Sequence, residues 1–196
     1  MPFDTGTAWP TPLRTIFEVA RATSGTLAYR YSGPYDKLRN YCFNEFTYFV
    51  APWQALRRED WNETIYLAVM DQHARPVFSI EVNHEDYDTR LFAPSAAKRV
   101  AADKQMRARY EDLLCLCSLP KLYGLSMMGT KMRVYVGDAT LMTIDPPPVP
   151  RTTDVLPGTY LENAWSVDIL SEEGFGKMKE IVDSIKTTPL NGDNNS

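Results

Sequence analysis

The sequence is poor in the residues that build zinc sites and disulfide frameworks. It contains three cysteines and two histidines in 196 residues, and neither histidine has cysteine or histidine neighbours at the spacing of zinc ligands. Cys42, Cys115 and Cys117 are an odd number and stand among apolar residues. We therefore predict buried core thiols in a reducing compartment rather than disulfides or a metal centre.

Long apolar runs and a strong net charge are also missing. No run approaches the roughly 20 apolar residues that cross a bilayer, so we expect no membrane partner. Residues 1–12 contain no apolar stretch of a secretory signal, which favours an intracellular protein of the cytoplasm or nucleus. The net charge of −4 gives no long-range attraction toward nucleic acid, so such a partner would need a local basic patch.

Several common catalytic motifs are lacking as well. The sequence has no Gly-x-Ser-x-Gly nucleophile elbow, no phosphate-binding P-loop and no Gly-x-Gly-x-x-Gly opening a helix, which excludes the enzyme classes that depend on them. What it does have is 44% hydrophobic and 12% aromatic residues, enough for a folded core despite 14 prolines. We expect one domain over residues 13–186, preceded by a mobile or surface-draped arm (1–12) and followed by a disordered tail (187–196).

The clearest pattern is a β-hairpin in the middle of the chain. Residues 64–70 and 76–83 are runs of β-branched, aromatic and aliphatic residues that flank a short polar turn. Because side chains alternate along a strand, Glu81 and Asn83 share one face and Val82 points to the other. A carboxylate at the end of an apolar strand is costly unless it has a partner or a role. Glu81 is therefore the first candidate for a functional residue.

The remaining elements follow from apolar spacing, turn residues and caps. Ser95 and Ser171 are placed to cap helices, and Gly33-Pro34 is placed to open one. The prolines at 146–150 form a stiff connection that is either a surface spacer or a recognition motif for a proline-binding domain. We predict helices over 13–22, 35–43, 95–117 and 172–185, and strands over 46–50, 122–128, 132–136 and 141–144, the last two joined through Gly137-Asp138.

These elements predict an α/β (α+β) domain with a mixed central sheet. Three consecutive strands with short connections form an antiparallel meander, and the long helix returns the chain for a fourth strand that pairs in parallel. The order is helix–β–β–β–helix–β, with an added C-terminal hairpin and helix.

This order resembles the core of the PD-(D/E)XK superfamily, the restriction-endonuclease-like fold. In that family an acid stands at the start of the second strand, and the third strand ends in Glu/Asp-x-Lys. Most of the chain is also similar to a group of uncharacterised fungal proteins. The motifs that carry the second resemblance are Arg75-Pro76-Val77, Ile80-Glu81-Val82, Gln105-Met106-Arg107-Ala108-Arg109-Tyr110, Leu122-Tyr123-Gly124-Leu125-Ser126 and Gly174-Phe175-Gly176-Lys177-Met178-Lys179.

The resemblance implies a metal site and assigns residues to it. Glu63 takes the place of the first acid, with Asp60 as the alternative, and Glu81 takes the acid of the third strand. The backbone carbonyl of Val82 would be a further ligand, and Gln105 matches a glutamine on the family's following helix. Such a set suits Mg²⁺ or Mn²⁺, which would activate a water and polarise the scissile phosphate.

The chain departs from the family at Asn83, where the pattern has lysine. An uncharged amide cannot stabilise the transition state as an ammonium does, so the departure implies a degenerate site. Two replacements are open: Lys104 or Lys98 could supply the ammonium from the long helix, or His84 could act as a base.

Three functions are therefore open. The first is a degenerate nuclease-like domain, a pseudoenzyme, that serves as a binding or scaffolding module; Glu81 then lines a vestigial site or pairs with Arg107 or Arg109. Such a module could still contact nucleic acid through the basic residues Arg57, Arg58, Lys98, Lys104, Arg107 and Arg109.

The second is an active Mg²⁺-dependent nuclease using Glu63, Glu81 and a displaced lysine. The third is a protein-interaction module working through the prolines and Trp53, Trp61 and Trp165.

Overall fold

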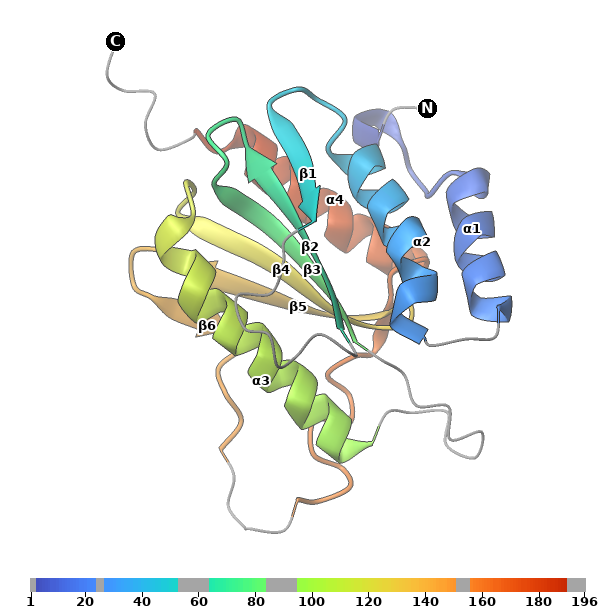
Figure 1. The fold of residues 1–196 in the computed structure, drawn as a ribbon, viewed down its shortest axis with the longest axis vertical. Coiled ribbons are helices and arrows are strands. Elements are labelled where there is room, and N and C mark those ends of the chain that lie inside the picture. The colour runs from blue at the N-terminus through green and yellow to red at the C-terminus, as the bar shows by residue number, and fades with distance from the viewer. Residues whose placement is uncertain (1–2, 24–26, 53–63, 84–94, 151–155, 190–196) are drawn as a thin grey trace.

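The computed structural model describes residues 3–23, 27–52, 64–83, 95–150 and 156–189. The helices are α1 (Thr11–Ala22), α2 (Leu27–Cys42), α3 (Ala96–Leu113) and α4 (Glu172–Thr187), with short 3₁₀ turns at Phe3–Thr5 and Leu114–Leu116. The strands are β1 (Tyr48–Pro52), β2 (Thr64–Asp71), β3 (Pro76–Asn83), β4 (Lys121–Met128), β5 (Lys131–Asp138), β6 (Thr143–Asp145) and β7 (Val167–Asp168). Figure 1 shows the strands gathered in one twisted sheet between helices.

The sheet confirms the mixed α/β class and the predicted order of elements. Its strands lie in the order β1-β2-β3-β4-β5-β6, and β7 also pairs with β5. Strands β1, β2 and β3 form an antiparallel meander, α3 crosses over, and β4 then pairs with β3 in parallel. The expected C-terminal hairpin and helix are present as β5–β6 and α4.

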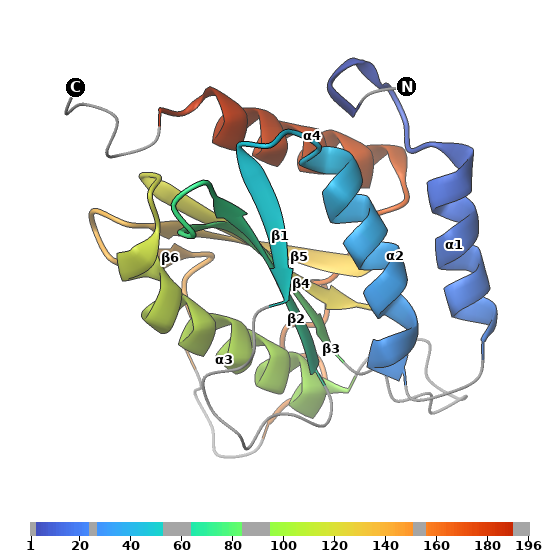
Figure 2. The same ribbon diagram turned by 45° about the horizontal axis from the view of Figure 1, so that its top comes forward.

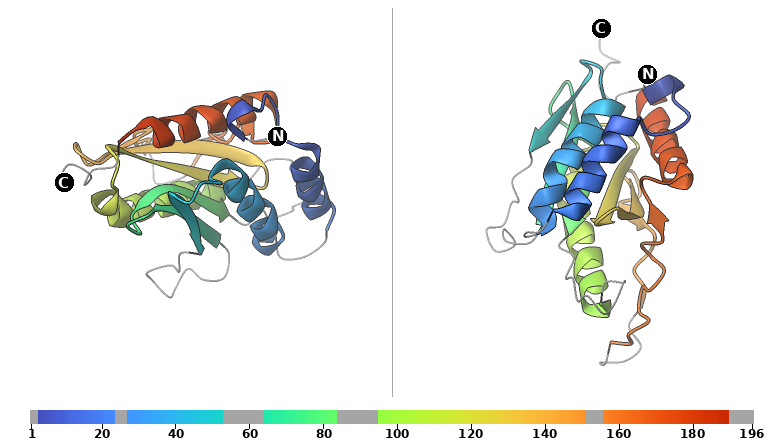
Figure 3. Two further views of the ribbon diagram at one scale, coloured as in Figure 1. Left: turned by 90° about the horizontal axis from the view of Figure 1, so that it is seen from above. Right: turned by 90° about the vertical axis from the view of Figure 1, so that its right-hand side faces the viewer.

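The two faces of the sheet carry different layers, as the views from above and from the side show (Figure 3). One face packs with α1, α2 and α4 into the larger core, which includes Phe78, Ile80 and Val82 of β3. The other face packs against α3 through a smaller cluster that includes Tyr66, Met106 and Tyr110. Glu81 lies on this second face, because it alternates with Ile80 and Val82 along β3.

The turn of the central hairpin is held by one carboxylate. Asp71 is fully buried and accepts hydrogen bonds from the backbone N–H groups of His73 (2.8 Å) and Arg75 (3.0 Å). Its other oxygen accepts from Arg75 Nε at 3.0 Å. Ala74 completes the turn at φ 60°. The hairpin predicted from the apolar runs is therefore confirmed, with Tyr66 opposite Glu81 in the register.

Two predicted boundaries are wrong for reasons of packing. Helix α2 starts at Leu27, so Pro34 lies inside it rather than at its first turn. The helix tolerates the hydrogen bond that Pro34 cannot donate, because its packing compensates for the loss. Tyr31, Tyr35 and Leu38, on successive turns around the proline, are all buried in the core.

The predicted turn at Gly137-Asp138 is also wrong, since both residues belong to β5. A Cβ at Gly137 would lie 2.6 Å from the ring of Tyr110. The glycine therefore permits the close approach of α3 instead of a turn.

Helix ends agree better with their predicted caps. The Ser95 hydroxyl accepts from the Lys98 N–H at 3.4 Å, and Ser171 Oγ accepts from the Gly174 N–H at 3.0 Å. Helix α3 ends at Leu113 and passes into a 3₁₀ turn, four residues before the predicted end. Within the described ranges no helix is long and apolar enough to cross a membrane.

The N-terminal arm is part of the core. Phe3 is fully buried and Trp9 is 5% exposed; their rings stack at 5.8 Å, and both contact Phe175 of α4. Trp9 Nε1 donates to the carbonyl of Ile169 at 2.6 Å. Two large aromatic rings hold the arm in place. The sequence analysis did not predict this burial, because the residues around the two rings are rich in proline and threonine. At the other end α4 continues to Thr187, and residues 190–196 of the expected tail lie outside the described residues.

Candidate functional site

A row of polar side chains crosses the sheet beneath α3. The register places Tyr66 of β2 beside Glu81 of β3, Glu81 beside Ser126 of β4, and Ser126 beside Arg133 of β5. All four are at most 7% exposed. Neighbouring strands therefore bring together residues that lie far apart in the sequence.

Glu81 pairs with an arginine from the helix above it. Its side chain is fully buried, and Oε2 lies 3.7 Å from Nε of Arg109. The Arg109 guanidinium also lies over the ring of Tyr66, 4.9 Å from the ring centre. Burial raises the pKa of Tyr66, so this phenol is neutral at physiological pH. The cation at Glu81 is thus held by charge on one side and by an aromatic face on the other.

Asn83 ties β3 to β4. Its amide nitrogen donates to Ser126 Oγ at 3.1 Å and to the carbonyl of Met127 at 3.3 Å, and the residue is 8% exposed. Val82, between the two site positions, has its side chain in the opposite core. Asn83 therefore has a bonding role between strands in the place where the family pattern has a lysine.

A second ion-pair cluster lies at the β5 end of the row. Asp103 of α3 accepts from Arg107 Nε (2.9 Å), Arg107 Nη2 (3.1 Å) and Tyr135 Oη (2.8 Å). Arg133 Nη1 lies 3.1 Å from the same carboxylate. Burial is the main reason why the pKa of Tyr135 is raised. One carboxylate is thus shared by two guanidinium groups at the boundary between α3 and β5.

Trp165 belongs to this cluster rather than to an exposed surface. Its ring lies 5.3 Å from the Arg133 guanidinium, and its Nε1 donates to the carbonyl of Ser126 at 3.0 Å. It is only 6% exposed. Of the tryptophans considered for partner contact, this one is buried, while Trp53 and Trp61 lie outside the described residues.

The other predicted site residues are not gathered at Glu81. Lys104 is exposed on α3, and Lys98 and Gln105 are half-buried there. Among the described residues, Arg109 is a cation that reaches Glu81, and it was among the alternatives left open by the sequence. The remaining predicted residues, Glu63, Asp60, Arg57, Arg58 and His84, lie outside the described residues.

The part of the site that the structure describes does not fit a divalent metal. Glu81 is fully buried beside a guanidinium, whose positive charge opposes a second cation at the same carboxylate. In the described ranges no three His, Cys, Asp or Glu residues are grouped so that they could hold a metal. A Mg²⁺ ion also needs room for several waters.

Sequence reasoning missed Tyr66, Ser126 and Arg133 of the row, and Asp103 of the ion-pair cluster beside it. Arg133 carried a usable signal, because a charge inside the apolar run Met132–Val136 is as unusual as Glu81 in β3. Tyr66 and Asp103 have no such signal in the sequence, because only the strand register and the angle of α3 bring them to the site.

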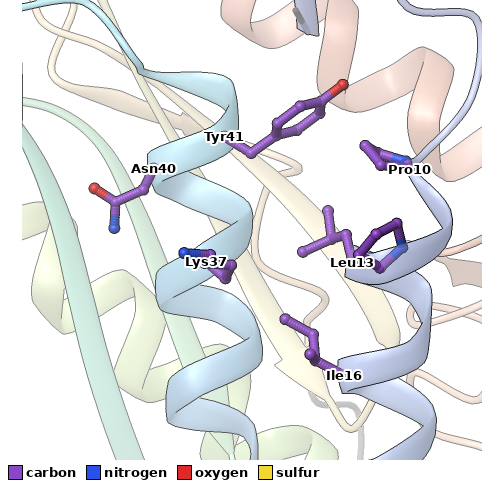
Figure 4. Close-up of a pocket in the computed structure, with 7 residues that line it drawn as sticks. Pro10, Leu13, Ile16, Lys37, Asn40 and Tyr41 are labelled. Carbon is purple, nitrogen blue, oxygen red and sulfur yellow. The ribbon is translucent and has the colours of Figure 1, made fainter. Parts of the chain in front are cut away.

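A separate hollow lies in the other layer of the molecule, between α1 and α2 (Figure 4). It has a volume of about 430 Å³ and mostly apolar walls, formed by Pro10, Pro12, Leu13, Ile16, Lys37, Asn40 and Tyr41. Its lining includes no acidic residue, so it offers no carboxylate for metal chemistry and is independent of the polar row.

No family model, no curated protein and no solved structure matches this chain. The resemblance to the restriction-endonuclease-like superfamily therefore remains a prediction from the order of elements and the motifs around Glu81.

Proposed function

We propose that this chain is a restriction-endonuclease-like domain without nuclease chemistry, which works as a binding or scaffolding module. The observation that carries the proposal is the burial of Glu81 against Arg109. In the family that the chain resembles, this acid would have to face a hydrated metal ion and a phosphate. Here it faces an arginine side chain that is itself only 16% exposed.

The residue two positions later supports the same conclusion. A lysine at the position of Asn83 would supply the charge that stabilises an attacked phosphate. Asn83 supplies none, and its amide nitrogen is bonded to Ser126 and Met127. Both positions of the Glu/Asp-x-Lys pattern thus serve the cohesion of the fold.

Nucleic-acid contact is the weaker part of the module hypothesis. Arg107 and Arg109 were predicted to contact phosphates, but both are mostly buried in ion pairs with Asp103 and Glu81. Lys104 is an exposed cation of α3, and Lys98 is half-buried. Any phosphate binding that remains would weaken steeply as salt rises, and binding that is insensitive to salt would argue against it.

A cleavage assay tests the proposal. Labelled single- and double-stranded DNA and RNA are incubated with the wild-type chain in Mg²⁺ and in Mn²⁺, with Glu81→Gln in parallel. Glu111→Gln is the matched control, because Glu111 is an exposed acid on α3. We expect no cleavage that depends on Glu81. Activity that Glu81→Gln abolishes and Glu111→Gln retains would overturn the proposal in favour of a Mg²⁺-dependent nuclease using Glu63, Glu81 and a displaced lysine.

A further inference from the structure

The connection after β6 is a stiff proline segment on the surface. It reads Pro146-Pro147-Pro148-Val149-Pro150, and its last four residues are exposed. Pro146, Pro147 and Val149 each precede a proline, which restricts their backbones to the extended or polyproline II region. A polyproline II helix has no internal hydrogen bonds, so its position depends on contacts with the rest of the chain.

The first of these contacts fixes the start of the segment to α3. Arg107 Nη2 donates to the carbonyl of Pro146 at 2.8 Å. The arginine is itself held by the two oxygens of Asp103, and its side chain is 15% exposed. The start of the segment is therefore bonded to a rigid donor.

The second contact fixes the other end through a tyrosine. Tyr160 Oη donates to the carbonyl of Val149 at 2.6 Å. Tyr160 is bonded in turn to α3, because Arg99 Nε donates to its carbonyl at 2.7 Å. Arg99, which is 3% exposed, also donates from Nη2 to the carbonyl of Gly158.

The two anchors start from different places along α3, Arg107 for Pro146 directly and Arg99 for Val149 through Tyr160. Arg99 and Arg107 are eight residues apart, or about 12 Å along α3. Pro146 and Val149 are separated by three residues, or about 9 Å in polyproline II geometry. Pro146 is thus fixed to the C-terminal half of α3, and Val149 is linked through Tyr160 to Arg99 near the N-terminus of the same helix.

We propose that residues 146–150 are a preformed ligand for the aromatic-lined groove of an SH3- or WW-type domain on a partner protein. Such grooves pack against the rings of a polyproline II helix, and exposed proline rings are what this segment presents. Fixing both ends removes much of the ordering entropy that a free peptide loses on binding. The inference rests on the proposed function, since it names the partner class of the module.

Binding of purified domains to the full chain tests the inference. The probes are an array of isolated SH3 and WW domains, with the affinity of each retained domain measured by calorimetry. Pro147→Ala combined with Pro148→Ala should weaken binding by at least about tenfold, because it removes two rings that the groove contacts. Pro12→Ala is the matched control, an exposed proline on α1 and outside the segment, and should bind as the wild type does.

A further variant tests whether the anchoring of the segment, and not only its proline sequence, contributes to binding. Tyr160→Phe removes only the hydroxyl that fixes Val149, and we expect about a threefold loss of affinity with the proline rings unchanged. The inference is overturned if the wild type retains no domain of the array, if the double alanine variant binds equally well, or if Tyr160→Phe has no effect. These failures are distinguishable from failure of the proposed function, because cleavage depends on Glu81 and domain binding on residues 146–150.

Discussion

Arg109 lies between the carboxylate of Glu81 and the ring of Tyr66, with Nε 3.7 Å from the acid and its guanidinium carbon 4.9 Å from the ring centre. The arrangement joins α3 to β2 and β3 through one side chain. Figure 2 shows α3 on the side of the sheet away from α4. This ion pair can be broken by substituting either the arginine or the glutamate. The two substitutions have different consequences for stability.

Removing the cation should be the more damaging change. Arg109→Met leaves the Glu81 carboxylate fully buried without this guanidinium, and loss of one partner of a buried ion pair typically costs about 3–5 kcal/mol. We expect a loss of that size in the free energy of unfolding, measured by urea denaturation at pH 7. Adding Glu81→Gln to this variant should recover part of the loss, because the remaining group is then neutral.

Lys104→Met provides the control for this experiment. Lys104 is an exposed cation on the same helix, and surface substitutions usually change stability by less than about 0.5 kcal/mol. An equal loss in both variants would mean that helix composition, rather than the ion pair with Glu81, sets the stability of α3.

Two glycines of α4 should respond in opposite directions to alanine. A Cβ at Gly174 would come within 2.6 Å of the backbone oxygen of Ile169, whereas a Cβ at Gly176 would meet no atom within 4 Å. Backbone cannot yield as a side chain can, so we expect Gly174→Ala to cost about 1–3 kcal/mol. Gly176→Ala should stabilise by about 0.4–1 kcal/mol, because alanine restricts the unfolded chain. Thermal unfolding of both variants checks the pair, and a stabilised Gly174→Ala would contradict the packing of α4 against residues 168–169.

The hairpin turn predicts a pH-dependent contribution from Asp71. Burial alone would raise the pKa of this carboxyl, but the hydrogen bonds from Arg75 and His73 hold the pKa below its ordinary value. The carboxylate therefore stabilises the fold above the unfolded pKa of about 3.9, and the stabilisation is lost as pH falls through the lower folded pKa. Asp71→Asn should cost about 2–3 kcal/mol at pH 7 and progressively less below about pH 4.

Urea titrations at pH 7 and at the lowest pH where the wild type still folds measure this difference. Asp112→Asn, which replaces an exposed acid near the end of α3, should show little change at either pH. A cost for Asp71→Asn that stays constant with pH would mean that the shape of the residue, rather than its charge, holds the turn.

The central hairpin could be predicted because its signal is local. Alternation along residues 64–70 and 76–83 fixed which side Glu81 faces, and the polar stretch at Asp71 fixed the turn. The capping serines at 95 and 171 were equally local. In each case the residues that determine the structure lie within a few positions of one another.

The site could not be predicted in the same way, because its members meet only through the register of four strands. Arg133 reaches the row across β4, and Asp103 reaches Arg133 because α3 crosses the sheet at that point. Phe3 and Trp9 were missed for a similar reason, since their partner Phe175 lies near the other end of the chain. Contacts between distant segments depend on the angles at which the layers pack. These angles cannot be predicted from the spacing of apolar residues in the sequence.

The three thiols should differ sharply in reactivity. Cys42 is fully buried, and burial raises its pKa well above the ordinary value. Burial also raises the pKa of Cys117, to about 11. The prediction of a buried core thiol is wrong for Cys115, which is exposed in the 3₁₀ turn after α3. Because the thiolate is the reactive form, a disulfide reagent at pH 8 should titrate one thiol rapidly in the folded chain and all three in denaturant.

Substitution identifies which thiol reacts first. Cys115→Ala should abolish the rapid phase, and Cys117→Ala should leave it unchanged. A rapid phase that survives Cys115→Ala would mean that Leu114–Leu116, the 3₁₀ turn after α3, opens often enough to expose Cys117. The Cys117 sulfur packs at the edge of both cores, so such opening would also loosen the contact of α3 with the sheet. Thiol reactivity therefore reports on the stability of the layer that covers Glu81.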